Sequence, residues 1–239
     1  MSIYLPFRGR DRFFNQGGDM KTFETPTPSA GWTVASPYDA WWDGKTIVTV
    51  GSGRDYEDPE TAVEAAADQS LILVDAGSYN TGEIIVTGKR LVVRGLGESP
   101  TDVIITQTED AVFEDQDLTT KGLLIENMKL VGSTNYRRAV NARSDIVVSK
   151  CHLYGYYTVN GMSSDGGTWE TILKNCYIER GTYHFSQVYR NHFHLIKCQL
   201  NGAIAELQAY NSWLTEDYVT SATEEYGYAY GDYYVNPIG

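Results

Sequence analysis

Short runs of apolar and β-branched residues recur along the chain from residue 71 onward, and glycine, asparagine, serine and aspartate separate them. The first four runs are residues 71–74, 83–86, 90–93 and 103–105. Runs of this length between turn-forming residues are typical of β-strands. Only residues 59–67 have the composition of a helix. The pattern therefore predicts an all-β body with one short helix.

A longer repeat underlies the later runs. Four segments can be aligned, at residues 123–130, 145–153, 171–178 and 194–200, and in each an apolar stretch precedes a polar turn, a Met or Cys, and a further apolar residue. The marker residues are Met128, Cys151, Cys176 and Cys198. They are separated by 23, 25 and 22 residues, which suits one solenoid turn made of three short strands. An antiparallel sandwich, the alternative fold, would repeat about every 8 to 12 residues.

We therefore expect a single-stranded, right-handed parallel β-helix over residues 46–210. An irregular N-terminal arm or cap would precede it at residues 1–45, and a Tyr/Gly-rich C-terminal arm would follow at residues 211–239. Asp58 is a suitable N-cap and Pro59 a suitable first residue for the helix at 59–67, which would close the open end of the coil. Stacked turns would place the Met and Cys markers in one internal column, with the thiols buried and reduced.

Composition excludes several partners. The formal net charge of -12 would repel a nucleic acid backbone, because the basic residues are scattered. No apolar run has the length of a membrane span, and the first residues lack the pattern of a secretory signal peptide. The three cysteines are too far apart for a CxxC-type metal site. We therefore expect no bound cofactor or metal and no nucleic acid or membrane partner.

Several segments carry a resemblance to a known family. Residues 49–56 contain a Gly-Ser-Gly turn and an aromatic residue, the helix at 61–66 follows, and residues 91–97 have the form of a first complete turn. These features resemble pectin methylesterases and related pectin-lyase-like β-helices, and the similarity extends over about residues 46–200. The resemblance implies the pectin-lyase-like fold.

The same resemblance bears on catalysis. Arg138 begins a segment similar to the family's Gln-Ala-Val, residues 151–158 are similar to Cys-Arg-Phe-Leu-Gly-Tyr-Gln-Asp, and residues 176–185 are similar to Cys-Tyr-Ile-Gly-Thr-Val-Asp-Phe. The family uses one aspartate as nucleophile, one as general acid–base, and glutamines that stabilise the oxyanion. The positions implied for them here hold Arg138, Tyr157, Thr158 and His184. Neither carboxylate is present, so we expect no esterase activity.

Two further groups of side chains invite a metal hypothesis. One comprises His152, His184, His192 and His194, and the other comprises Asp110, Glu114, Asp115 and Asp117. The acidic group lacks the Asp-x-Asp-x-Asp-Gly calcium loop with its terminal glutamate. Ordinary hydrogen-bonded histidines and a solvated acidic loop are the interpretations that we favour over a metal or acid–base role.

The C-terminal arm alternates tyrosine with small residues. We expect it to dock on another subunit or on a particle surface, and packing along its own coil or disorder are the alternatives. The interface tyrosines are Tyr226, Tyr228, Tyr230, Tyr233 and Tyr234. A β-helix with arms and without catalytic carboxylates suggests a non-enzymatic, homo-oligomeric virion component, such as a decoration protein, head spike or tail spike of a tailed phage, assembled in the host cytoplasm.

The alternative function is a carbohydrate-binding or carbohydrate-active β-helix related to the pectin methylesterases. Aromatic side chains along the flank of the coil could stack on the sugars of a surface glycan. The candidates are Tyr154, Tyr156, Trp169 and Tyr183.

Overall fold

The computed structural model describes the backbone of residues 46–107, 109–115, 122–132, 137–162, 169–189, 191–196, 198–200, 209–210, 212–217, 220–221 and 233–237. Within these ranges, side chains are described for residues 46–160, 171–179, 194–196 and 198–200. The expected irregular arm at residues 1–45 lies outside the described residues.

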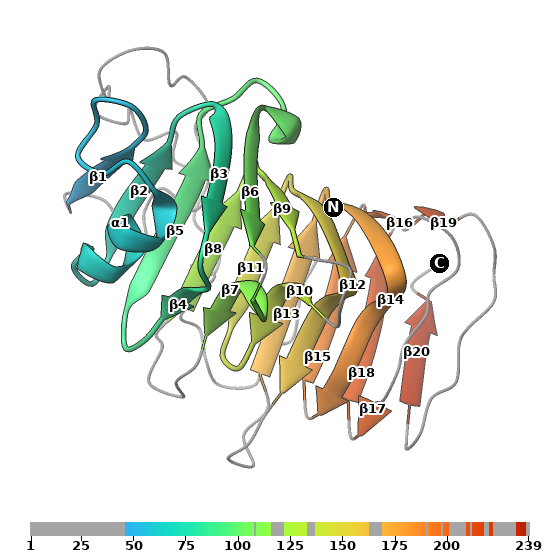
Figure 1. Cartoon of the computed structure of the whole chain (residues 1–239). Helices are drawn as coiled ribbons and strands as arrows, with labels where there is room; N and C mark the ends of the chain where they lie inside the picture. Colours follow the sequence, from blue (N-terminus) through green and yellow to red (C-terminus); the bar gives the residue numbers. More distant parts are fainter. Residues whose placement is uncertain are drawn as a thin grey trace, which may run out of the picture.

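Nine parallel strands form the first sheet, which we call sheet A (Figure 1). Its strands are β1 (Ile47–Val50), β2 (Ser70–Val74), β5 (Arg90–Gly95), β8 (Gly122–Glu126), β11 (Ile146–Ser149), β13 (Trp169–Lys174), β15 (Asn191–Ile196), β18 (Ser212–Asp217) and β20 (Tyr233–Pro237). Each strand pairs with the next in chain order, and every pairing is parallel. Every turn of the chain therefore adds one strand to this sheet.

The second sheet, sheet B, has two halves that meet at a bend. Its first half contains β3 (Gly77–Thr81), β6 (Val103–Gln107), β9 (Lys129–Val131), β16 (Gln199–Leu200) and β19 (Thr220–Ser221). Its second half contains β4 (Ile84–Val86), β7 (Ala111–Asp115), β10 (Arg138–Ala142) and β17 (Ala209–Tyr210). The long strands β12 (His152–Met162) and β14 (Tyr177–Tyr189) run through both halves, with a register shift between Gly155 and Tyr157.

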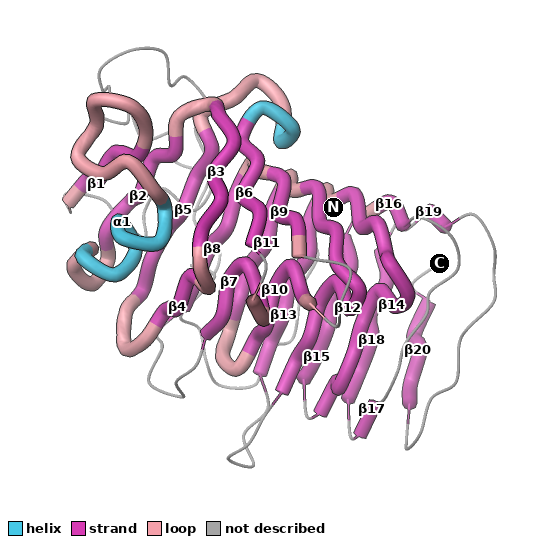
Figure 2. Tube along the Cα trace, in the orientation of Figure 1, coloured by secondary structure: helices cyan, strands magenta, loops and turns pink. Residues whose placement is uncertain are grey.

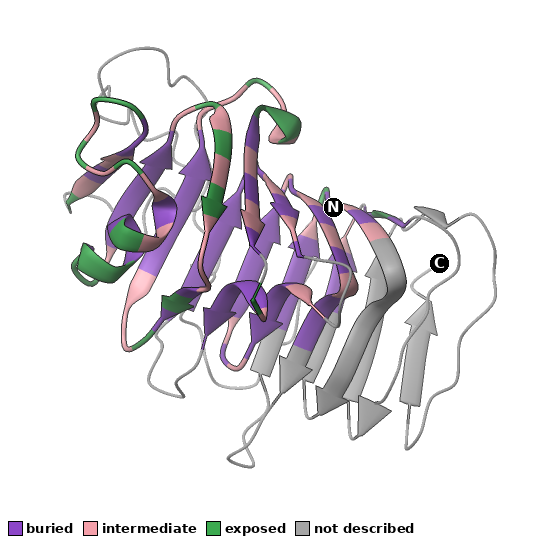
Figure 3. Ribbon diagram, in the orientation of Figure 1, coloured by how far each residue is buried: buried purple, intermediate pink, exposed green. Residues whose placement is uncertain are grey.

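This topology confirms the expected pectin-lyase-like parallel β-helix and excludes the antiparallel sandwich. A described turn runs from sheet A to the first half of sheet B, then to its second half and back to sheet A, as β8, β9, β10 and β11 do. Figure 2 shows these turns stacked along one axis. Apolar side chains from sheet A and from both halves of sheet B fill the interior. Figure 3 shows most of the described strand residues buried, whereas β3 and the N-terminal helix have exposed positions.

The corner between sheet A and sheet B explains the spacing of the sequence repeat. Asn127, Lys150 and Asn175 each adopt a left-handed backbone, with φ of 57°, 53° and 54°. This conformation turns the chain sharply, and asparagine tolerates it better than most residues do. The residue after each corner is a repeat marker that points into the coil. The repeat therefore records one sharp corner per turn.

The marker residues form the expected internal column. Gln199 N donates to Cys176 O, Tyr177 N donates to Cys151 O, and His152 N donates to Met128 O, so the markers lie one above another. All three cysteines are free and buried. Each thiol donates to a carbonyl of the preceding turn, for example Cys176 Sγ to Val148 O at 3.4 Å. Burial raises the pKa of Cys151 to about 12, so this thiol is protonated at neutral pH.

Helix α1 (Pro59–Ala65) covers the N-terminal end of the coil, as expected, although it ends two residues before the predicted residue 67 (Figure 1). The Asp58 carboxylate accepts the N–H of Thr61 at 2.8 Å, which satisfies one of the free donors of the first turn. Ala62 and Val63 face the core. Lys89 Nζ donates to the Glu64 carbonyl at 2.7 Å near the other end of the helix. A short 3₁₀ helix, η2 (Pro100–Asp102), lies further along the chain.

The coil extends beyond the boundary expected at residue 210. β18 pairs with β15, and β20 pairs with β18 from Ser212↔Tyr233 to Glu216↔Pro237. The sequence repeat did not show these turns because they hold no Met or Cys marker. Tyr233 and Tyr234 thus lie on a strand of their own chain's sheet, whereas Tyr226, Tyr228 and Tyr230 lie outside the described residues.

The outer face of sheet A has its own apolar column. One residue per turn lies in register along five strands, and all five are at most 2% exposed. They are Leu71, Val92, Leu124, Val147 and Ile172. In the neighbouring column, Arg94 Nε donates to Glu126 Oε2 at 2.7 Å, and both side chains are buried. None of the helices in the described part of the chain is long and apolar enough to span a membrane.

Candidate functional site

The four positions that the family resemblance singled out come together on the second half of sheet B. Arg138 on β10 is in register with Tyr157 on β12, and Tyr157 is in register with Tyr183 on β14. Thr158 and His184 follow directly on these strands. The side chains of Tyr183 and His184 are outside the described residues. The backbone therefore places these positions on three neighbouring turns, as a shared site requires.

Thr158 is fully buried, and its hydroxyl group is committed to the backbone. Its Oγ1 donates to Glu179 O at 3.1 Å and is 3.3 Å from Gly155 O. These contacts between the hydroxyl group and the two carbonyl groups stabilise the bend where β12 passes from one half of the sheet to the other. A hydroxyl in this position has no acidic proton to exchange near neutral pH, so Thr158 cannot serve as a general acid or base.

Arg138 is held by Asp110 on the neighbouring turn. Its Nη1 donates to the Asp110 carboxylate, and its backbone N donates to Asp110 O at 2.9 Å. The Arg138 side chain is 15% exposed. The guanidinium group is thus fixed at the outer face of the sheet and keeps part of its surface open to solvent.

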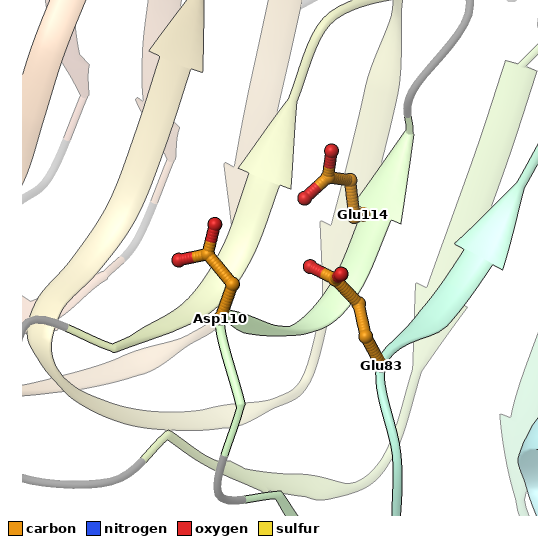
Figure 4. Close-up of side chains that lie close together, drawn as sticks. All are labelled: Glu83, Asp110 and Glu114. Carbon is orange, nitrogen blue, oxygen red and sulfur yellow. The ribbon is translucent and has the colours of Figure 1, made fainter.

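Asp110, the partner of Arg138, belongs to a cluster of three carboxyl groups (Figure 4). Oxygen atoms of Glu83, Asp110 and Glu114 all lie within 4.8 Å of one another. Glu83 directly precedes β4, Asp110 directly precedes β7, and Glu114 lies on β7. The pairing Ile84↔Phe113 brings the two turns together. Glu83 Oε1 also accepts the N–H of Ala111 at 3.1 Å.

Burial raises the pKa of Glu83 to about 8, and a hydrogen bond to Glu114 and repulsion by its charge act in the same direction. Glu83 is therefore mostly protonated at pH 7 and shares its proton with Glu114. Sequence analysis identified Asp110 and Glu114 but missed Glu83, which is 27 residues before Asp110. Asp115 is also buried on β7, outside the cluster, so the solvated acidic loop that we favoured from the sequence is wrong for these strand residues, and Asp117 lies outside the described residues.

The carboxylate of Glu114 is oriented by a buried polar column. Asn141 Nδ2 donates to Glu114 Oε2 at 3.0 Å, and Asn160 Nδ2 donates to Asn141 Oδ1 at 2.6 Å. These residues occupy equivalent positions on β7, β10 and β12. Arg143 Nη2 lies 3.4 Å from Glu114 Oε1. Two arginines and an asparagine column thus hold the carboxylates from one side.

The carboxylates offer oxygen ligands of the kind that Ca²⁺ and Mg²⁺ prefer. However, Asp110 and Glu114 are already paired with guanidinium groups, and Glu83 carries a proton. Calcium normally takes about 6 to 8 oxygen ligands, which far exceeds this set. The group is better described as a hydrogen-bonded, charge-balanced network.

The two described members of the histidine group that we considered from the sequence lie on different sheets. His152 lies on the first half of sheet B and bonds Glu179 Oε2 at 2.9 Å, whereas His194 is buried on sheet A. The side chains of His184 and His192 are outside the described set. His152 also makes an edge contact with Tyr177, with 4.8 Å between the ring centroids. This is an ordinary hydrogen-bonded histidine, as we favoured from the sequence.

The candidate sugar-stacking residues are only partly described. Tyr156 and Tyr157 are half-buried and make an edge-to-face contact with 4.7 Å between centroids. Tyr154 lies apart from them on the first half of sheet B, in register with Glu179. The side chains of Trp169 and Tyr183 are outside the described residues. The described aromatic surface closest to Arg138 is therefore the Tyr156–Tyr157 pair.

We define the polar strip as Glu83, Asp110, Glu114, Arg138, Arg143 and Tyr157. It follows the second half of sheet B across β4, β7, β10 and β12 and the residues that flank them. Its members are connected by the ion pairs, hydrogen bonds and strand register described above. Apart from the buried Glu114, its members are partly exposed, so the strip offers donors, acceptors and an aromatic ring along one direction, parallel to the axis of the coil.

No family model and no curated protein matches the chain. Solved structures do match. A pectin methylesterase from Aspergillus niger superposes with a TM-score of 0.53 at 16% identity, over 81% of this chain and 90% of the other. The rice weevil pectin methylesterase gives 0.51 at 18% identity, over 72% and 65%. A pectin methylesterase mutant in complex with a hexasaccharide gives 0.54 at 14% identity, over 77% and 70%. The chain thus has a pectin methylesterase-like parallel β-helix fold.

Proposed function

We propose that this pectin methylesterase-like β-helix binds a carbohydrate along the polar strip and does not hydrolyse methyl esters there. The observation that carries the proposal is that Arg138 and Tyr157 lie in register on neighbouring strands, with Asp110 bonded to the arginine. A sugar offers hydroxyl groups to charged donors and acceptors and an apolar ring face to an aromatic side chain. The strip provides all three kinds of contact.

The arrangement of the strip also suits a chain-like ligand. Its residues follow successive turns, and turns of a parallel coil are about 4.8 Å apart. Residues along the strip therefore present a series of contacts in one direction. One fold neighbour was solved in complex with a hexasaccharide, which supports a saccharide as the ligand class for this fold.

The residues at the aligned catalytic positions do not support the esterase reaction. Thr158 at the acid–base position is buried and bonded to backbone carbonyls, so it cannot transfer a proton to a leaving group. His184 occupies the nucleophile position that the sequence alignment gave, in place of an aspartate. Arg138 replaces a neutral glutamine and is already bonded to Asp110. We therefore assign the strip to binding.

The test combines a binding assay with an activity assay. The purified protein is screened against an array of neutral and acidic polysaccharides, and affinity for the best ligand is measured by calorimetry. Arg138→Ala should weaken binding about tenfold or more, equivalent to about 1.4 kcal/mol, because it removes the central donor. Incubation with methylated pectin should release no methanol above a protein-free blank.

Arg54→Ala provides the matched control. Arg54 is also paired with an aspartate, Asp75, at 2.6 Å, but it lies in the turn between β1 and α1. Its replacement should leave glycan affinity unchanged. Equal glycan affinity of the Arg138→Ala variant and the unaltered protein would refute glycan binding along the strip. Methanol release that is abolished by Thr158→Ala would refute the assignment of the strip to binding alone.

The second candidate function is a structural component of a larger assembly, including a phage particle. One observation favours it: β20 is the last strand in the pairing order of sheet A. The outer edge of such a strand presents backbone donors and acceptors to which another chain can add. Docking through this end and through the interface tyrosines remains a proposal.

Removal of residues 224–239 tests this second candidate. The truncation deletes β20 and the five interface tyrosines, so an assembly that docks through them should fall apart into smaller species in light scattering. An unchanged oligomer with a lower melting temperature would contradict docking, because it would show that the segment only completes its own chain's coil.

A further inference from the structure

The charges of the polar strip are balanced within the strip itself. Arg138 is bonded to Asp110, and Arg143 lies 3.4 Å from Glu114. Both arginines therefore already have an anionic partner. Among the side chains described here, no basic residue of the strip lacks a carboxylate partner.

Glu83, the third carboxyl group of the strip, adds no charge to the strip at neutral pH. Glu83 lies within 4.8 Å of the other two carboxylates, where a third negative charge is disfavoured, and this effect outweighs the Ala111 N–H that Glu83 accepts. Its raised pKa agrees with this position. With Glu83 protonated, the two carboxylates and two guanidinium groups of the strip cancel.

The rest of the chain decides which ligands can approach this neutral strip. The formal net charge is -12, so a polyanion meets repulsion as it comes within about 10 Å, the distance over which charges are felt at 0.1 M salt. A polyuronate brings one negative charge per sugar, and the guanidinium groups of Arg138 and Arg143 are already paired with carboxylates. A neutral glycan meets no such barrier and can use the same donors and acceptors.

We propose that the polar strip selects uncharged glycans over polyuronates. This inference rests on the proposed function, since it assumes that the strip binds carbohydrate. It follows from the pairing Arg138–Asp110 and Arg143–Glu114 together with the net charge of the chain. Sugar hydroxyl groups would replace part of the solvent around Arg138, and Tyr157 would cover a ring face.

The experiment compares two ligands that share one sugar backbone and differ in the charge and the methyl ester of each uronate unit. Fully methyl-esterified and de-esterified oligogalacturonides of equal length are titrated into the full chain at low and high salt, beside a neutral galactan. We expect the esterified form and the galactan to bind about tenfold or more tightly than the free acid at low salt. The difference should shrink as salt screens the repulsion.

Two variants connect the selectivity to the strip. Asp110→Asn removes the partner of Arg138 and should raise the affinity for the free acid at least threefold, because a guanidinium group becomes available to a carboxylate. Glu98→Gln changes the net charge by the same amount on an exposed loop between β5 and η2 and should have no comparable effect.

The outcomes separate the two proposals. Equal or tighter binding of the free acid overturns the uncharged-ligand inference and leaves the binding function standing. Unchanged selectivity in Asp110→Asn likewise overturns the inference. Absence of binding to any glycan refutes the proposed function, and the inference then falls with it.

Discussion

Glu126→Ala is expected to lower the free energy of unfolding by about 3 to 5 kcal/mol. Glu126 accepts a bond from Arg94 Nε at 2.7 Å, and the two side chains are only 4% and 3% exposed. Lys150 Nζ lies 3.7 Å away and is itself 43% exposed. Removal of the carboxylate leaves the Arg94 charge in a position that water scarcely reaches. Urea unfolding monitored by circular dichroism would measure the loss.

A more exposed ion pair supplies the control. Arg54 and Asp75 are 2.6 Å apart with side chains 27% and 28% exposed. Asp75→Ala should cost about 1 kcal/mol or less, because solvent compensates an exposed charge. Replacing Arg94 and Glu126 together by leucine should recover most of the stability, since both charges of this buried pair are then removed. A loss below about 1 kcal/mol for Glu126→Ala would contradict the expectation.

Gly95→Ala is expected to destabilise the coil by about 3 kcal/mol, the upper end of the range for overpacking. An added Cβ would lie 2.1 Å from the carbonyl oxygen of Asn127, and a backbone atom cannot rotate away as a side chain can. Asn127 also donates through Nδ2 to Gly95 O at 3.0 Å and to Gly97 O at 2.7 Å. Two adjacent turns are therefore fixed at this point, and thermal unfolding should reveal the strain.

Gly77→Ala is the matched control on β3. The nearest atoms to its added Cβ belong to the Tyr79 ring at 3.5 Å, an ordinary contact distance, and the backbone there is not left-handed. The same chemical change should leave the melting temperature unchanged or raise it slightly. A Gly95→Ala variant that melts like Gly77→Ala would show that the two turns separate easily at this corner.

The fold could be predicted because the solenoid repeats itself in sequence. Met128, Cys151 and Cys176 recur because each follows a sharp left-handed corner, and a buried Met or Cys side chain fits the inside of that corner. Asp58 and Pro59 predicted the capping helix, because the preferences for an N-cap and for the first helical residue are local. These features depend on residues close together in the chain, so a single sequence reveals them.

The polar strip could be predicted only in part. The family resemblance located Arg138 and Tyr157, but Glu83 gave no signal because its partners lie about one turn away and in a different segment. The Asn141–Asn160 column was missed for the same reason, since asparagine on a strand usually indicates a surface or a turn. Stacking between turns depends on the register, which loop lengths set and composition does not reveal.

The C-terminal boundary was missed for a different reason. β18 and β20 pair through the backbone, and their side chains repeat none of the marker pattern that defines the earlier turns. Tyrosines at 233 and 234 occur as readily on strands as at interfaces. The tyrosine-rich sequence therefore did not show whether this segment completes the coil or contacts a partner.

In sheet A, the order of strands in space is the order of strands in the chain. The end covered by α1 is therefore also the end that leaves the ribosome first. Each later turn needs only the turn made just before it as a template, so the coil can grow during translation without waiting for distant residues. Helix α1 covers apolar residues at the starting end of the coil. The direction of protein synthesis is therefore also the direction in which the turns of sheet A are stacked.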